Sequence, residues 1–205
     1  MTRTSFTWIT WHYPTTQTAG RRIAGKANSP ITTEAVYRWA TADTNDITAQ
    51  VGRATVGAVT ITTGLNIPLN AWAFTVMTYD ETNGINIYNG TLTVAAAIAS
   101  YTTQTIGSGA TVDVNGPMGY GNEGDTTFAL AYEGRIAFFG MWNRVLTLGE
   151  IIQQQWKPHV TSGCVVFQYP GSNGTGTQPD WSGNNNSGVV TGATVGVGVS
   201  LGATF

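Results

Sequence analysis

Apolar and polar residues alternate over short runs along this chain, which is the pattern of β-strands rather than of helices. In residues 5–13 large side chains occupy both alternating faces, so this run predicts an inner strand covered on two sides. Residues 35–42 and 47–51 predict a hairpin, and a β-branched run follows at 56–62. This part of the chain therefore predicts a β-sheet fold.

The middle of the chain carries two further strand signals. Residues 71–79 alternate, and their apolar face carries Trp72, Phe74, Val76 and Thr78. A turn at 80–84 follows. The next alternating run contains Asn89 and Gly90, two residues that tolerate positive φ, and this pair predicts a type I′ hairpin turn.

Residues 134–142 give the last strong strand signal. We expect one face of this strand to carry Ile136, Phe138, Gly140 and Trp142. A short helix is predicted directly after it, at 147–156, because Thr147 and Glu150 have the spacing of a capping box.

The predicted helix has an apolar stripe that should face the sheet. Its members are Leu148, Ile151, Ile152 and Trp156. Lys157 and Pro158 end the helix. No other segment gives a convincing helical pattern.

The remainder of the chain has a different composition. It is rich in turn-forming residues, then alternates valine with glycine near its end. We therefore divide the chain into a main domain, 1–160, and a C-terminal segment, 161–205. One or two strands are expected in that segment, which either complete the main sandwich or dock onto a neighbouring chain.

Charge is scarce along the whole chain. Only 10% of the 205 residues are charged, and the formal net charge is −2. No basic run extends beyond Arg21-Arg22, so we expect no binding to nucleic acid. No stretch approaches the length of a membrane span or of a signal peptide. We therefore expect no membrane contact, and a chain that is not secreted by a signal peptide or that leaves the cell by lysis or within a particle.

Two stretches resemble laminin-G-like members of the concanavalin A-like lectin/glucanase superfamily. In the first, 72–93, the matching positions are Trp72, Tyr79, Asp80, Ile87, Tyr88, Asn89 and Gly90. In the second, 132–151, they are Gly134, Ile136, Trp142, Asn143, Arg144, Leu146, Thr147, Glu150 and Ile151. The resemblance spans about residues 6–156. It implies an all-β, concanavalin A-like jelly-roll sandwich of two antiparallel sheets.

The C-terminal segment also resembles part of such domains. Its stretch 180–188 is similar to a D-x-S-G-N-x-x-x-G strand that often precedes their first strand. Here the stretch lies near the C-terminal end instead. Either it fills the same place in a permuted order, or it begins a further module.

Catalytic patterns are absent or incomplete. Hydrolases of this superfamily carry carboxylates in an E-x-D-x-x-E pattern, and the nearest match, Glu123 and Asp125, has Phe128 at its last position. The two histidines, His12 and His159, are far apart in the sequence and are expected to be structural. We therefore expect no enzymatic activity.

Two other simple patterns give structural interpretations. Residues 119–124 match G-x-G-x-x-G, but no helical pattern follows, so a glycine-rich loop is the better interpretation. The single cysteine, Cys164, is expected to be a buried apolar residue because it lies in an apolar run.

Glycan binding requires an aromatic platform and hydrogen-bonding loops. The candidate residues are Asn115, Tyr120, Asn122, Asp125 and Trp181. No metal or other cofactor is expected. The resemblance leaves calcium open, because some laminin-G-like domains bind it through loop aspartates. Asp80, Asp113, Asp125 or Asp180 would suit this role, although each is equally a turn former.

Two functions are weighed. The first is a non-enzymatic structural protein with a lectin-like fold on a phage or virion, as a head decoration, fibre or tail component. Its partners would be copies of itself or capsid and tail proteins, with contact to glycans. The alternative is a carbohydrate-binding module, with or without calcium. We expect a location on a virion or at the extracellular surface.

Overall fold

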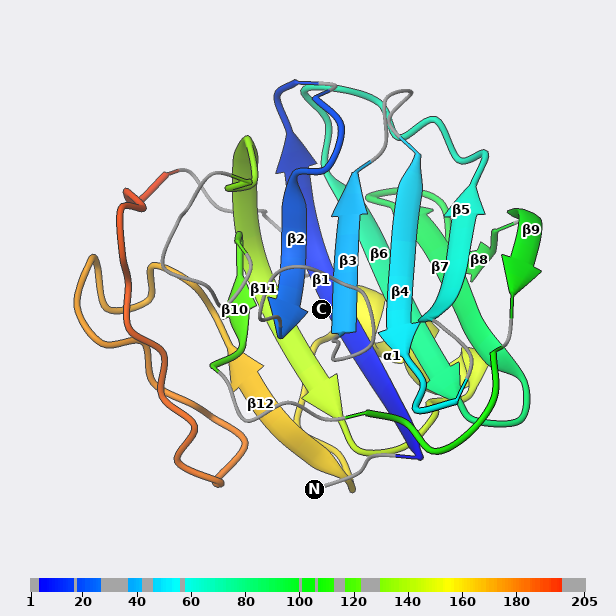
Figure 1. Cartoon of the computed structure of the whole chain (residues 1–205). Coiled ribbons are helices and arrows are strands. Elements are labelled where there is room, and N and C mark those ends of the chain that lie inside the picture. Colours follow the sequence, from blue (N-terminus) through cyan, green and yellow to red (C-terminus); the bar gives the residue numbers. More distant parts are fainter. Residues whose placement is uncertain are drawn as a thin grey trace.

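The computed structural model in Figure 1 describes most of the chain. The described residues are 4–16, 18–26, 37–41, 46–55, 58–99, 101–105, 107–112, 117–122 and 130–196. They form two antiparallel sheets of six strands each and one short helix. The expected all-β sandwich of the concanavalin A-like type is therefore confirmed.

The first sheet has the strand order β12-β11-β1-β6-β7-β8. Its strands are β1 (Ser5–Pro14), β6 (Ala73–Asp80), β7 (Gly84–Thr91), β8 (Ala97–Ile98), β11 (Gly134–Trp142) and β12 (Cys164–Gln168). Strand β1 pairs with β6 on one side and with β11 on the other. As predicted, it is an inner strand with large side chains buried on both faces, including Trp8 and Trp11.

The second sheet has the order β10-β2-β3-β4-β5-β9. Its strands are β2 (Arg22–Lys26), β3 (Tyr37–Thr41), β4 (Ile47–Gly52), β5 (Ala58–Thr63), β9 (Tyr101–Thr105) and β10 (Gly119–Tyr120). The predicted hairpin is present, because β3 pairs with β4 in antiparallel register.

Two apolar cores hold these elements together. The larger core fills the space between the sheets and contains residues of both, such as Phe6, Trp8, Ile61 and Phe139. The second core lies on the outer face of the first sheet, where Trp11, Phe74 and Phe138 are covered by Ile151 of α1 (Leu148–Trp156) and by Leu146. Burial on both faces of the first sheet explains its large apolar side chains.

The hairpin turn expected at Asn89-Gly90 is wrong. The chain turns earlier, at residues 81–83, and both residues lie inside β7, opposite β6. A Cβ atom at Gly90 would lie 2.6 Å from Nε2 of Gln155 and 2.9 Å from the backbone nitrogen of Ala96. Glycine is needed here because α1 and the next turn approach the strand closely.

The expected common face of β11 is also only partly correct. Phe138 and Trp142 belong to the outer core, and Gly140 lies between their rings. A register shift in the β1–β11 ladder places Ile136 opposite His12, while Trp11 pairs with Phe138. This bulge turns Ile136 toward the other sheet, where it approaches Gly121.

The helix α1 begins as predicted but buries a different face. Thr147 and Glu150 form the capping box, and the helix is capped at Lys157. Leu148 and Trp156 of the expected buried stripe are exposed instead. Ile151 is buried together with Gln154 and Gln155, and the Gln155 amide bonds to the backbone of the turn at 91–96.

A buried arginine holds the segment that precedes the glycan-binding candidates Asn115 and Tyr120. Arg53 donates to the Tyr79 hydroxyl oxygen (2.9 Å) and to the carbonyl of Gly109 (2.7 Å). Nearby, one carboxylate oxygen of Glu81 accepts from the backbone nitrogen of Thr111 (2.8 Å). Residues 107–112 are therefore fixed against β4 and β6 by a charged network.

The C-terminal segment begins with β12, which pairs antiparallel with β11 and so lies in the first sheet. Figure 1 shows the chain after β12 running along the outside of the sandwich, beside β12 and β10. Residues 189–196 form no strand, despite their alternating pattern, and 197–205 lie outside the described residues. Docking of this segment on a neighbouring chain stays a prediction. In the described part of the chain, no helix has the length and apolar character needed to cross a bilayer.

Candidate functional site

The segment after β12 is organised by the carboxylate of Asp180. Its Oδ1 atom accepts hydrogen bonds from the backbone nitrogens of Phe167 (3.0 Å) and Ser182 (3.0 Å), and its Oδ2 atom accepts one from that of Asn186 (2.8 Å). Burial alone would raise the pKa of Asp180, but these hydrogen bonds outweigh it and hold the pKa below its ordinary value. Asp180 therefore stays charged and ties the segment to β12.

Three more polar side chains bond to the backbone of β12. Ser182 Oγ donates to the carbonyl of Val165 (2.9 Å), and Asn186 Nδ2 donates to the same oxygen (2.9 Å). Asn184 Nδ2 donates to the carbonyl of Cys164 (2.9 Å). These side chains satisfy carbonyl groups that a neighbouring strand would otherwise pair, so they close the edge of the first sheet.

Trp181 lies in the centre of this arrangement. Its backbone nitrogen donates to the carbonyl of Phe167 (2.9 Å), and both of its chain neighbours are held by the hydrogen bonds described above. Its side chain is nevertheless 59% exposed. Trp181 is thus a large aromatic group that projects from a fixed backbone.

The same segment also touches β10. A Cβ atom at Gly188 would lie 3.2 Å from Oε1 of Gln168 and 3.4 Å from the hydroxyl oxygen of Tyr120. Gly188 also exchanges two backbone hydrogen bonds with Gln178 (2.8 and 2.9 Å). Residues 178–188 therefore form a closed loop that spans from β12 to β10. We call this loop the edge loop.

The ring of Tyr120 packs against the core between the sheets rather than facing solvent. Its ring stacks on Phe139 with 5.1 Å between the centroids and 18° between the planes. Burial raises the pKa of Tyr120 to about 12, so the phenol stays protonated. Its hydroxyl group, beside Gly188, is the part of Tyr120 that adjoins the edge loop.

The polar loop candidates are only partly described. Asn122 is half-buried, and among the described residues neither polar atom of its side-chain amide has a hydrogen-bond partner. The same holds for Oε1 of the buried Gln168. Buried polar atoms without partners are costly, and ordered water or a ligand commonly supplies the missing bonds. Asn115 and Asp125 lie outside the described residues.

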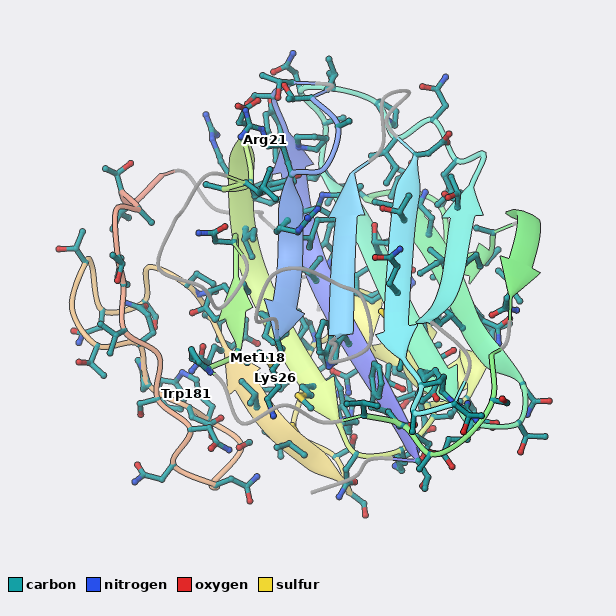
Figure 2. The ribbon with its side chains drawn as sticks, in the orientation of Figure 1. Arg21, Lys26, Met118 and Trp181 are labelled. Carbon is teal, nitrogen blue, oxygen red and sulfur yellow. The ribbon has the colours of Figure 1, made fainter. Side chains whose placement is uncertain are left out.

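Figure 2 shows how these positions are distributed over the molecule. Met118 lies opposite Lys26 if the β10–β2 register is continued by one residue, and both appear in the same part of the view as Trp181. Arg21 lies at the other end of the molecule, where its guanidinium pairs with Glu133 (2.5 Å). Trp181, on the edge loop, thus lies away from this ion pair.

The residues that position Trp181 were missed by sequence reasoning. Asp180, Ser182, Asn184 and Asn186 stand at every second position, which is the spacing of one face of a strand. That period is the signal that could have identified them as partners of a sheet edge. Asp180, Ser182 and Asn184 lie in the stretch 180–188 that resembles a D-x-S-G-N strand, but their hydrogen bonds to the edge of β12 were not predicted.

The calcium candidates in the described chain have other partners. Asp80 accepts from the backbone nitrogens of Thr82 (2.7 Å) and Asn83 (2.8 Å), and so it shapes the β6–β7 turn. Asp180 holds the edge loop. Among the described residues no three acidic, histidine or cysteine side chains gather into a group that could hold a metal ion. Asp113 and Asp125 lie outside those residues, and calcium stays an open alternative to the expectation of no cofactor.

Histidine and cysteine occupy structural positions. His12 is buried between the Tyr132 hydroxyl (2.7 Å from Nδ1) and the Thr75 hydroxyl (2.8 Å from Nε2). Burial lowers the pKa of His12 to about 3, so its imidazole is neutral at ordinary pH. Burial also raises the pKa of the half-buried Cys164 thiol to about 12, which suppresses the reactive thiolate.

Residues 1–152 match the profile of a laminin G family that is described as the Concanavalin A-like lectin/glucanases superfamily. The chain belongs to this superfamily. No curated protein matches the sequence of this lectin-like chain.

Solved structures of lectin-like proteins resemble the chain in fold. One is described as a "putative carbohydrate binding protein" from Bacteroides ovatus ATCC 8483, with a TM-score of 0.69 and 15% sequence identity. The match covers 98% of this chain but only 57% of that protein, so the lectin-like chain spans little more than half of its length. Another is a heptameric SAP-like pentraxin from Limulus polyphemus, with a TM-score of 0.47 and 14% identity over 75% of this chain and 70% of that one.

Proposed function

We propose that this chain is a non-enzymatic carbohydrate-binding module whose aromatic platform is Trp181. The superfamily supports this proposal, as does the fold that the chain shares with the Bacteroides ovatus protein described above. The fold alone carries many functions, so the proposal depends on the site. The observation that carries it is the exposed indole of Trp181 on a hydrogen-bonded backbone.

An exposed indole on a fixed backbone is suited to bind a sugar ring. The apolar face of a pyranose stacks on an aromatic plane, and stacking loses less entropy when the aromatic group is already positioned. The backbone of Trp181 is positioned in this way, because Asp180 and Ser182, on either side of it, are bonded to β12. A Trp on a mobile loop would have to be ordered during binding.

Two amides of the same loop supply hydrogen-bonding groups for sugar hydroxyls. The Nδ2 atoms of Asn184 and Asn186 donate to β12, so the oxygen atom of each amide is the atom that can accept from a ligand. Both residues are exposed. Asp180, in contrast, is occupied by backbone donors and acts on the ligand only through the loop that it holds.

The proposal is for binding without hydrolysis. A glycosidase of this superfamily requires a second carboxylate at the position that Phe128 occupies in the nearest match. The phage or virion interpretation gains no support from the comparisons and stays a prediction, as does the location of the protein. It remains compatible with glycan binding.

A glycan array tests this function. We expect the chain to bind a defined group of glycans and the Trp181→Ala variant to lose about fivefold or more in affinity, because stacking of a nucleic-acid base on one aromatic group contributes about 1–3 kcal/mol and we expect a similar contribution from a sugar ring. Trp156→Ala is the matched control, since Trp156 is 41% exposed but lies on α1. An equal loss of glycan affinity in both variants would contradict the proposal. So would the absence of glycan binding by the wild-type chain both with and without a calcium chelator.

A further inference from the structure

The two edges of the first sheet differ in what covers them. At one edge the edge loop covers β12 and bonds to its backbone. At the other edge, β8 pairs only with β7 in the part of the chain that the structure describes. Figure 1 shows β8 on the side of the sandwich away from the edge loop. An uncovered edge is a ready surface for another strand.

Apolar side chains gather at this open edge. Val94 is 60% exposed and Ile98 is 58% exposed, and Leu92 and the alanines at 95 and 97 are exposed as well. The turn that carries them is held in place by α1, because the Gln155 amide donates to the carbonyls of Thr91 and Val94 (2.8 Å each). We call residues 92–98 the open-edge surface.

The open-edge surface lacks any charge. No Asp, Glu, Lys or Arg occurs between Glu81 and Asp113, a stretch that includes all of β7, β8 and β9. Natural sheets protect such edges with a charged residue, most often lysine, with a covering segment, or by keeping the edge strand short. Strand β8 has only two residues, so a partner would contact mainly the exposed apolar side chains. Among the residues that the structure describes, none covers this edge, whereas the opposite edge has a covering loop held by specific hydrogen bonds.

The geometry points to a second copy of this chain as the partner of the open-edge surface. In a two-fold dimer each surface meets itself, so any net charge would face the same charge, and an uncharged surface avoids that repulsion. Two β8 strands related by a two-fold axis perpendicular to the sheet run antiparallel, which allows backbone pairing across the contact. An anionic membrane is disfavoured as the partner, since the surface carries no basic residue.

Sedimentation velocity over a wide range of protein concentration tests this inference. We expect the wild-type chain to reach a dimer as its concentration rises. Val94→Lys and Ile98→Lys each place two like charges in the contact, and we expect each to raise the dimer dissociation constant about tenfold or more. Circular dichroism confirms that the variants are folded.

Val189→Lys is the matched control, because Val189 is 83% exposed but lies beyond the edge loop. We expect it to leave the dimer unchanged. A wild-type chain that stays monomeric at the highest concentration would overturn the inference. So would a dimer that is weakened equally by Val189→Lys, or not at all by the open-edge variants. Glycan binding by a monomeric variant would leave the proposed function intact, so the two proposals fail separately.

Discussion

At the residue scale, a row of hydrogen-bonded polar side chains around His12 lies in the interior of the sandwich. His12 lies between the hydroxyl groups of Tyr132 and Thr75, and the Thr75 hydroxyl lies 3.4 Å from Oδ1 of Asn89. His12 and Thr75 are fully buried. The neutral imidazole can satisfy both hydroxyl partners, since one ring nitrogen donates and the other accepts.

This arrangement predicts a pH-dependent stability. The pKa of His12 is about 3 in the folded chain and about 6.5 in the unfolded chain, so between these values the unfolded state binds the extra proton. The free energy of unfolding should therefore fall as the pH drops below 6.5, by about 1.4 kcal/mol for each pH unit. Urea titrations between pH 7 and 5 measure this, above the range in which Asp180 and Glu150 titrate, since their pKa values are lowered.

The control is His12→Gln, which keeps a hydrogen-bonding side chain but cannot take up a proton. We expect its stability to change little over the same pH range. If this variant does not fold, the chemical shift of the His12 imidazole in the wild-type chain decides the question. An imidazole that titrates near pH 6.5 in the folded chain would contradict the account.

At the scale of elements, the start of α1 is determined by local sequence, whereas its buried face is determined by packing. The capping box of Thr147 and Glu150 was predictable because both partners lie within four residues of each other. The buried face was not, because Gln155 is buried by its bonds to residues 91–96, which are distant in sequence. An apolar stripe rule assigns polar residues to solvent and cannot detect a glutamine that caps a remote turn.

Gln155→Ala should therefore destabilise the chain strongly. The Gln155 amide accepts from the backbone nitrogen of Ala96 (2.7 Å) and donates to two carbonyls. Removing it leaves these groups without their partner, and each buried loss costs about 1–3 kcal/mol. We expect the free energy of unfolding in urea to drop by more than about 2 kcal/mol.

Gln153 provides the comparison for this helix, since it lies two positions away and is exposed. Gln153→Ala should change the free energy of unfolding by less than about 0.5 kcal/mol. Similar effects of the two substitutions would show that Gln155 does not fasten the 91–96 turn.

The edge loop is a second element whose stability depends on one residue. Asp180→Ala removes the acceptor of three backbone hydrogen bonds, so amide hydrogen exchange at Phe167, Ser182 and Asn186 should become faster. Asp80→Ala is the control, because Asp80 accepts similar bonds in the β6–β7 turn. Exchange in the edge loop that responds equally to both variants, or to neither, would contradict the role of Asp180.

The two wrong predictions for the sheets have related causes. Asn89-Gly90 has the composition of a turn, yet Gly90 is required by the close approach of Gln155. The face of Ile136 depends on a bulge whose position is set by pairing with β1. In both cases a local pattern was outweighed by a partner that is distant in sequence.

At the scale of the whole molecule, the sandwich holds its two proposed binding surfaces at opposite edges of one sheet. Trp181 stands beside β12, and the open-edge surface lies at β8. A dimer through β8 would place the two Trp181 side chains toward its outer ends. A dimer with two glycan sites binds a glycan-coated surface more strongly than a monomer with one site, provided that the surface presents ligands at that spacing.

The fold could be predicted from the alternating strand patterns, which indicate which faces are buried. The resemblance of residues 6–156 to laminin-G-like domains pointed to the same fold. The site was harder to predict. Trp181 was recognised by its setting in a polar segment, but its rigid support depends on bonds to β12 that composition does not reveal. Tyr120 was chosen for its glycine-rich surroundings, whereas its ring packs on Phe139.

Fluorine NMR of the chain labelled with 5-fluorotryptophan tests the central claim most directly. The seven tryptophans give separate probes, and the Trp181 resonance is the one that disappears in Trp181→Phe. On addition of the glycan with the strongest array signal, we predict that the Trp181 resonance shifts while those of the buried Trp8, Trp11 and Trp142 do not. A glycan that binds without moving the Trp181 resonance, or that moves another tryptophan instead, would contradict the account.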